Sequence, residues 1–281
     1  MLSVVERVSH SLLLTFGARS RLVATGAGKV HAYEILGAGE GTFVLLHGIG
    51  TSATTYAPLL RLMVSRARRV VMLDLPGHGR SEEPIGGLDS KALAAGVSDA
   101  LDVLVDPRDK AIVAGNSLGG AAAIGYALDR PSHVRALVLV SPAGAPLDEH
   151  ALGEIRARFN LRTRADARRF FSELLHEPPF YFRVLEGGLV AQLSRPVVRG
   201  FLASLVASDF FTAERLATLA PPTTVLWGKS DRILPRSGLH FYRRALPAGT
   251  RFEEIEGVGH SPHLERPSLV AARILDAYRF G

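Results

Sequence analysis

Residues 115–120 read Gly-Asn-Ser-Leu-Gly-Gly, directly after the apolar run Ala-Ile-Val-Ala at 111–114 and before small, helix-compatible residues at 121–124. A strand that turns abruptly into a helix through Gly-x-Ser-x-Gly places its serine on a strained turn. The strand and the first helical turn pass so close that side chains at Gly115 and Gly119 would collide. The turn also sets the Ser117 hydroxyl beside a backbone N–H and a helix N-terminus. The motif therefore predicts Ser117 as a nucleophile.

Composition narrows the class of protein. The chain has 281 residues, 47% of them hydrophobic, which is enough for one substantial core with a lid. It has no cysteine, which excludes disulfides, a thiol nucleophile and thiolate metal sites. No apolar stretch approaches the roughly 18–20 residues that span a bilayer, and the start lacks the charged region and long apolar run of a signal peptide. We therefore expect a cytoplasmic protein without a transmembrane segment.

The net charge of +6 does not indicate a nucleic-acid partner. The arginines are scattered, apart from a group between Arg156 and Arg169, and no basic stripe with interleaved aromatic residues is present. We read that group as a solvated helix face, with an anion-binding patch as the alternative, and expect no binding of nucleic acid.

Short β-rich runs alternate with helical patterns along most of the chain. Runs such as 43–46 and 137–140 are continuously apolar, as in strands covered on both faces. This alternation predicts an α/β fold with a largely parallel sheet and helices on both faces. The predicted strands are 29–35, 42–46, 69–73, 111–114, 136–140, 223–227 and 251–255, and the predicted helices include 56–65, 90–105, 119–129 and 268–280.

The alternation divides the chain into three parts. Residues 26–144 and 221–281 form the predicted α/β core. Residues 145–220 are helical in pattern and rich in arginine and phenylalanine, which predicts a cap above the sheet whose aromatic side chains partly line a ligand cavity. Residues 1–25 are predicted to be an N-terminal helix or arm. Its first twenty residues either pack on the body or make a peripheral membrane or dimer contact.

Two side chains further along the chain complete the set that a serine nucleophile needs. A serine hydroxyl is a weak nucleophile and requires an adjacent base, which an acid must orient. His260 lies in Gly-Val-Gly-His-Ser-Pro (257–262), directly after the last predicted strand. Asp231 lies in Trp-Gly-Lys-Ser-Asp-Arg (227–232), also just past a strand. The chain order Ser, Asp, His predicts a triad of Ser117, Asp231 and His260.

A fourth element, His-Gly-Ile-Gly at 47–50, follows the predicted strand 42–46. Attack on a carbonyl develops an oxyanion, which needs two N–H donors. We expect these donors to be the backbone amides of Ile49 and Leu118. The residues predicted to support the two turns are His47, Gly48, Gly50 and Asn116.

These motifs make the chain resemble the α/β-hydrolase superfamily over nearly its whole length beyond about residue 25. The resemblance rests on 47–50, on Asp-Leu-Pro-Gly-His-Gly-Arg-Ser at 74–81, and on 115–120, 227–232 and 257–260. It implies an eight-stranded, mostly parallel sheet with a helical cap inserted after the sixth strand. Some relatives place the acid after the sixth strand, where Asp148 is the nearest candidate, so Asp148 is the alternative to Asp231.

Ser117 indicates acyl transfer, because the epoxide hydrolases and haloalkane dehalogenases that the chain resembles need a carboxylate at this turn. We predict a serine hydrolase of the carboxylesterase or lipase type, which takes a small-molecule acyl substrate and water. The pair His260 and His263 has no carboxylate pattern beside it, so we expect no metal and no cofactor.

Other functions stay open. Carbon–carbon bond hydrolases of aromatic degradation, which act on a vinylogous diketone, share similar motifs. The chain departs from them at Ser261, where they usually carry Trp, and at residues 51–52, Thr-Ser where they usually have Pro-Gly. A thioesterase would find the cap arginines useful for a phosphorylated carrier. A ligand receptor without turnover is the remaining alternative.

Overall fold

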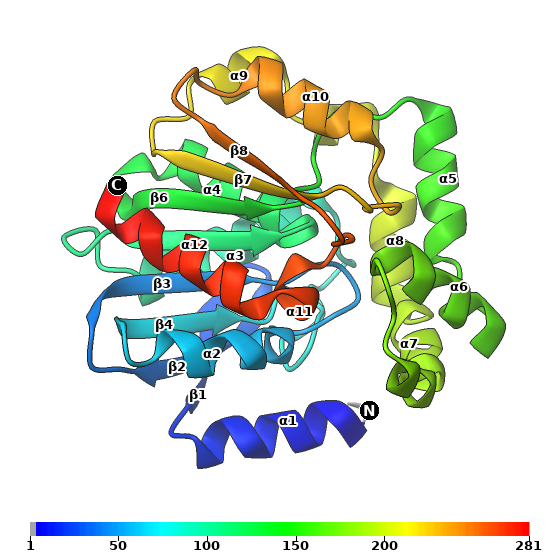
Figure 1. Ribbon diagram of the computed structural model, residues 1–281, viewed down its shortest axis with the longest axis horizontal. Helices are drawn as coiled ribbons and strands as arrows, with labels where there is room; N and C mark the ends of the chain where they lie inside the picture. The colour runs from blue at the N-terminus through cyan, green and yellow to red at the C-terminus, as the bar shows by residue number, and fades with distance from the viewer. Residues whose placement is uncertain (1–3, 281) are drawn as a thin grey trace.

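The computed structural model describes residues 4–280 and places eight strands in one sheet, in the order β1-β2-β4-β3-β5-β6-β7-β8 (Figure 1). The β1–β2 and β2–β4 pairs are antiparallel and the other neighbours are parallel. The predicted mostly parallel sheet is confirmed, with each of the seven predicted strands inside one of these elements. The strands are β1 (Arg19–Thr25), β2 (Gly28–Leu36), β3 (Glu40–Leu46), β4 (Ala67–Leu73), β5 (Ala111–Asn116), β6 (Val134–Val140), β7 (Thr223–Gly228) and β8 (Arg251–Ile255).

The edge strand β1 corrects the prediction for the N-terminal segment. Residues 1–25 were expected to be a helix or arm, but only α1 (Val4–Thr15) is helical, and β1 pairs with β2. In β1 only Val23 is buried, so the segment lacks the apolar pattern that identifies a strand. The first three residues lie outside the described part of the chain.

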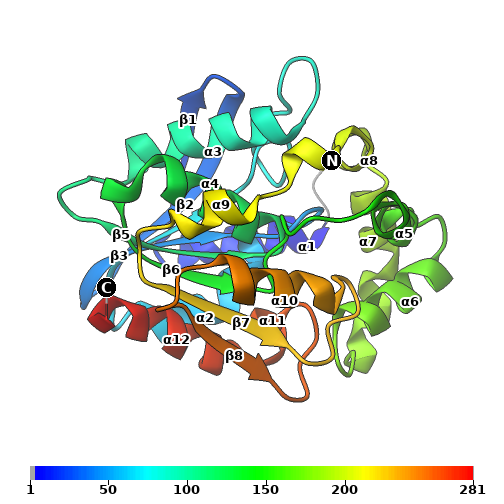
Figure 2. The ribbon, with the colours of Figure 1, turned by 90° about the horizontal axis from the view of Figure 1, so that it is seen from above.

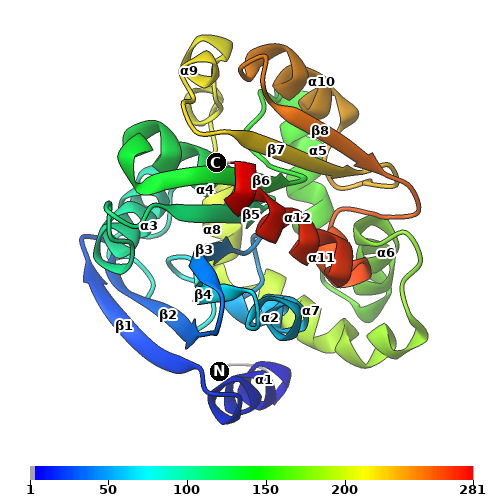
Figure 3. The same cartoon turned by 60° about the vertical axis from the view of Figure 1, so that its left-hand side comes forward.

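Helix α1 lies at the β1–β2 end of the sheet (Figure 3). Its Leu13 is buried, whereas Val8, Leu12 and the following Phe16 are more than half exposed. A peripheral or dimer contact by this segment stays a prediction.

Helices cover both faces of the sheet (Figures 1 and 2). One buried cluster joins α2 and α12 to one face, and a second joins α3, α4 and α10 to the other. The core helices are α2 (Ala57–Met63), α3 (Ser90–Leu104), α4 (Leu118–Asp129), α10 (Arg236–Ala245), α11 (Pro262–Glu265) and α12 (Pro267–Phe280), with 3-10 turns η1 (Ala53–Tyr56) and η2 (Pro131–His133).

The segment between β6 and β7, where the sequence predicts a cap, contains only helices and turns. In Figure 1 its helices α5 to α8 lie beside the carboxyl ends of the strands. Its elements are α5 (Glu149–Phe159), α6 (Arg164–Leu174), η3 (Phe180–Leu185), α7 (Glu186–Leu193), α8 (Pro196–Ser204), η4 (Ala207–Asp209) and α9 (Ala213–Ala217).

Within residues 4–280, no single helix has the length and apolarity needed to cross a membrane. One pair of segments bent by 99°, Pro196–Ser204 with Ala207–Ala217, meets that test of length and composition when taken together.

The turn from β5 into α4 is the tightest part of the fold. Ser117 has φ 54° and ψ −118°, a conformation that costs free energy in any residue other than glycine. A Cβ on Gly115 would lie 2.2 Å from the Gly119 carbonyl oxygen, and one on Gly119 would lie 2.1 Å from the Leu46 carbonyl oxygen in β3. Backbone atoms occupy the space that a side chain would need at 115 and 119. Both positions therefore require glycine, as the sequence predicts.

We expect Gly119→Ala to lower the free energy of unfolding by about 3 kcal/mol, because its methyl group meets backbone that cannot move aside. Gly153→Ala is the matched control, since a Cβ at this helical position meets nothing within 4 Å. The control should gain up to about 1 kcal/mol from helix propensity. Denaturant unfolding measures both variants, and equal stability of the two would contradict this account of the turn.

Candidate active site

Four loops at the carboxyl ends of neighbouring strands carry the predicted site residues. Residues 47–50 follow β3, Ser117 follows β5, Asp231 lies just past β7, and His260 lies past β8. Because parallel strands of one sheet end at the same edge, residues far apart in the sequence meet there.

Asp231 and His260 form a buried hydrogen-bonded pair. The Nδ1 atom of His260 lies 2.8 Å from Oδ2 of Asp231, and both side chains are less than 5% exposed. The other Asp231 oxygen accepts backbone N–H groups from Ile233 at 2.9 Å and Leu234 at 3.1 Å. An ionised carboxylate only accepts hydrogen bonds, so the imidazole proton lies on Nδ1 and Nε2 is left as the basic atom.

Asp148, the alternative candidate for the acid, makes a different contact. Its side chain accepts the Ala151 N–H at 2.7 Å and caps the start of α5. His260 has its carboxylate partner in Asp231 instead.

Ser117 is buried at the end of β5, and its neighbour Asn116 joins it to the histidine loop. The Asn116 side-chain amide donates to the carbonyl oxygens of Val140 and His260, each at 3.0 Å. Among the described residues, the Ser117 hydroxyl makes no hydrogen bond to His260. Contacts of this kind are often long in unliganded enzymes and shorten when substrate binds.

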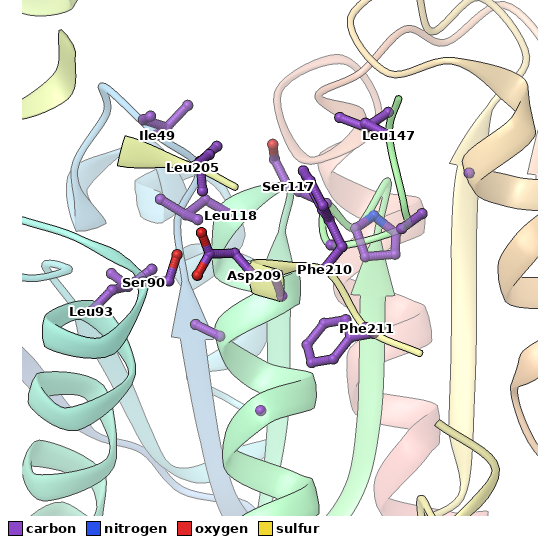
Figure 4. A pocket seen from close by; sticks show the side chains of 18 of the residues that line it. Ile49, Ser90, Leu93, Ser117, Leu118, Leu147, Leu205, Asp209, Phe210 and Phe211 are labelled. Carbon is purple, nitrogen blue, oxygen red and sulfur yellow. The ribbon is translucent and has the colours of Figure 1, made fainter. Parts of the chain in front are cut away.

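Two backbone N–H groups lie beside the serine without an acceptor. Neither the Ile49 nor the Leu118 amide is hydrogen bonded within the described chain, and both residues line the same cavity as Ser117 (Figure 4). The turn after β3 comes close to the serine, because a Cβ on Gly48 would lie 3.4 Å from the Ser117 Cβ. The arrangement can offer two donors to an oxyanion.

His47 fixes this turn. The backbone N–H of Leu75 donates to its Nε2 at 3.0 Å, and its Nδ1 lies 2.8 Å from the Gly48 carbonyl oxygen. Burial lowers the pKa of His47 below its ordinary value, so the ring is neutral near pH 7. Gly50 has φ 67° and packs against the cap, since a Cβ there would overlap the Leu193 side chain. These contacts support the structural roles predicted for His47 and Gly50.

The cap is hydrogen bonded to both loops that carry the predicted acid and base. The His260 N–H donates to the Leu174 carbonyl oxygen at 2.7 Å, and Arg232 donates to the Ser172 carbonyl oxygen at 2.8 Å. The His176 ring lies 2.7 Å from the Ser230 hydroxyl. The end of α6 and the loop after it therefore hold the positions of residues 230–232 and 260.

Glu265 also connects the cap to the loop that carries His260. Its two oxygens accept the backbone N–H groups of Gly259 and His176, each at 2.7 Å. Burial raises the pKa of Glu265 despite these two donors, which act in the opposite direction. Sequence reasoning missed Glu265, because nothing in the pattern around it shows that the cap chain returns to this point.

A cavity of about 470 Å³ opens from Ser117 between the core and the cap (Figure 4). Of the cap aromatics predicted to line a cavity, Phe210 and Phe211 do so, whereas Phe170 and Phe171 are buried in the core of the cap. Most of the lining is apolar. The charged residues on it are Lys91, Asp129, Asp209 and Arg215.

His263 is buried against an aromatic side chain. Its ring is buried, with its centroid 4.9 Å from that of Tyr56, and its Nδ1 has no hydrogen-bond partner. Within residues 4–280, no group of three or more His, Asp or Glu side chains is placed to hold a metal ion.

A sheet of this order with a serine at the β5–α4 turn defines the class of the protein. A model of the alpha/beta hydrolase family matches residues 43–273, and the chain belongs to that family. It is thus an enzyme of the hydrolase type.

Three relatives indicate the range of the family. The 2-hydroxy-6-oxononadienedioate/2-hydroxy-6-oxononatrienedioate hydrolase of Cupriavidus pinatubonensis is 28% identical, over 79% of this chain and 82% of the relative. The structure of carboxylesterase CesB from Bacillus subtilis is 21% identical with a TM-score of 0.79, over 99% of this chain and 98% of that one. A structure of a bacterial membrane phospholipase A is 26% identical with a TM-score of 0.81, over 99% and 94%.

The buried, neutral His263 should make stability depend on pH. Burial lowers the pKa of His263 from 6.5 to about 3. Between these values the unfolded chain binds a proton that the folded chain does not. The free energy of unfolding therefore falls by about 1.4 kcal/mol per pH unit as the pH is lowered.

We expect His263→Phe to remove about this slope between roughly pH 6 and 4, measured by urea unfolding at each pH. The exposed His240→Phe is the control and should keep the wild-type slope. A His263→Phe slope equal to that of the wild type would show that His263 is not held neutral.

The cap contacts predict an effect of Glu265→Gln on turnover. Glutamine offers one acceptor oxygen, so one of the two backbone N–H groups faces an NH₂ group instead. Losing a hydrogen bond to a charged group costs about 1.5–3 kcal/mol. We expect kcat to fall about tenfold with KM nearly unchanged, because the position of His260 shifts.

The exposed neighbour Glu177→Gln is the control and should keep the wild-type kcat. Circular dichroism melting separates the two roles of Glu265. A lower melting temperature with an unchanged kcat for the folded fraction would make Glu265 a purely structural residue.

Proposed function

We propose that the enzyme hydrolyses carboxylic esters through an acyl-enzyme on Ser117. The observation that carries the proposal is the buried Asp231–His260 pair at 2.8 Å, at the same sheet edge as the strained serine and the two unpaired N–H groups. The largely apolar cavity beside Ser117 suits an uncharged ester.

In the proposed reaction, His260 Nε2 takes the Ser117 proton while Oγ attacks the ester carbonyl. The carbonyl electrons move onto oxygen, and the Ile49 and Leu118 N–H groups bind that oxyanion. The C–O bond to the alcohol then breaks as His260 returns the proton to the leaving oxygen. Water, deprotonated by His260, releases the acid from Ser117 in the same way. Asp231 stays ionised and stabilises the imidazolium in both steps.

Carbon–carbon bond hydrolysis is the second candidate, and the relative from Cupriavidus pinatubonensis favours it. The substrate in that relative's name is a dicarboxylate. The cavity of this chain holds two carboxylates, Asp129 and Asp209, against two cations, Lys91 and Arg215, and Arg215 is already paired with Asp129 at 3.1 Å. This balance of charge does not favour a dianion, so we place ester hydrolysis first. The similarity to a phospholipase A, by its name an ester hydrolase, agrees with this order.

The test compares p-nitrophenyl butanoate with a 2-hydroxy-6-oxo-dienoate as substrates of the purified protein. We expect ester turnover, and a loss of about 10⁴-fold or more in kcat for Ser117→Ala. Ser141→Ala is the matched control. Ser141 is also buried with a positive φ of 42° at a strand end, but it does not line the cavity.

Fast turnover of the dienoate with slow ester hydrolysis would replace the first candidate by the second. Ester turnover that survives in Ser117→Ala would refute the proposed nucleophile.

A further inference from the structure

The cavity that begins at Ser117 follows one face of α4. The α4 residues on its wall are Leu118, Ala121, Ala122, Gly125, Tyr126 and Asp129. Their spacing of three and four residues puts them on one side of the helix from its first turn to its last. The cavity is therefore elongated, with Ser117 near one end of this face.

The opposite walls come from the core and the cap. Helix α3 contributes Leu93, Ala94 and Ser98, and the segment between α8 and α9 contributes Leu205 and Phe210. Figure 4 labels Leu205, Asp209 and Phe210 among the side chains that line this cavity together with Leu118.

At the far end, Asp129 and Arg215 form an ion pair at 3.1 Å with both side chains about half exposed. The elongated space thus runs from a buried serine to the surface.

We propose that this space, the α4 channel, binds a straight alkyl chain of the substrate, of about a dozen carbons. The proposal rests on the ester hydrolysis proposed above. Eleven helical steps separate Leu118 from Asp129, a length of about 16 Å. An extended carbon chain advances about 1.25 Å per bond, from a bond length of about 1.5 Å and an angle of about 111°. The α4 channel therefore matches a medium to long alkyl chain.

The charges in the channel select against an acidic chain end. The Asp209 carboxylate lines it, with Oδ2 held by the Val206 N–H at 2.8 Å. Asp129 at the far end is already paired with Arg215. Lys91, which also lines the cavity, only offsets Asp209, so no net positive charge is left to hold a terminal carboxylate, and the preferred chain ends in a methyl group.

Gly125 is the position that tests the proposal. It lies seven helical steps from Leu118, about 10 Å along the channel. A Cβ on Gly125 meets nothing within 4 Å, and its backbone needs no glycine conformation. A leucine side chain at this position would therefore enter the channel without displacing the fold, and would shorten it to about eight carbons.

The experiment measures kcat/KM for p-nitrophenyl esters from butanoate to hexadecanoate in the wild type, Gly125→Leu and the control Gly153→Leu. Gly153 lies on the exposed side of α5, where a Cβ also meets nothing. Each buried methylene raises affinity up to about fourfold. We expect wild-type kcat/KM to rise with length to about the dodecanoate. In Gly125→Leu the rise should stop near the octanoate, with at least about a tenfold loss for the dodecanoate relative to the butanoate, whereas Gly153→Leu should keep the wild-type profile.

A parallel series of alkyl acetates tells whether the chain belongs to the acid or the alcohol, since only the series whose chain enters the channel will respond to Gly125→Leu. Equal length profiles for Gly125→Leu and the wild type in both series would overturn the proposal.

Binding of dodecan-1-ol, measured by calorimetry, tests whether the α4 channel binds an alkyl chain, and it needs no turnover. Weaker binding to Gly125→Leu supports the channel even if no ester is hydrolysed, in which case only the proposed function fails. Equal binding to both proteins would overturn the channel.

Discussion

The close approach of β5, α4 and β3 at Ser117 is the constraint on which the rest of the site depends. Glycine at 115 and 119 lets the backbone of three elements meet within van der Waals distance, and Ser117 takes up the strain with a positive φ. That strain is tolerated because β5 is buried along its whole length and packs between β3 and β6. A looser turn would leave the serine without a fixed position relative to the loop after β3.

The loops that carry the proposed acid and base depend on a different support. They contact the cap through the carbonyl of Leu174 and the ring of His176, and contact each other through the 2.8 Å pair. The cap therefore does two things in one fold. It encloses the cavity in which we propose the α4 channel, and it holds the loops that carry Asp231 and His260. A change in the cap that suits a new substrate would therefore also shift the position of His260.

The sequence alone predicted what local pattern and motif spacing determine. Short β-rich runs, several of them continuously apolar, predicted seven strands, and the order of Ser117, Asp231 and His260 at strand ends led to the proposed site. Strand β1 was missed, because an exposed edge strand has no apolar alternation to reveal it. Glu265 and the α4 channel were also missed, since both depend on where the cap returns to the core, and that is set by long-range packing rather than by any local signal.

The most direct measurement is mass spectrometry of the protein after reaction with an organophosphate ester such as paraoxon, which phosphorylates activated serines. The account predicts one phosphoryl adduct per chain, on the peptide that contains Ser117. Labelling should be abolished in Ser117→Ala and strongly slowed in His260→Ala, because the base activates the hydroxyl. An adduct on another residue, or equal labelling of His260→Ala, would contradict the claim that Ser117 is a nucleophile activated by His260.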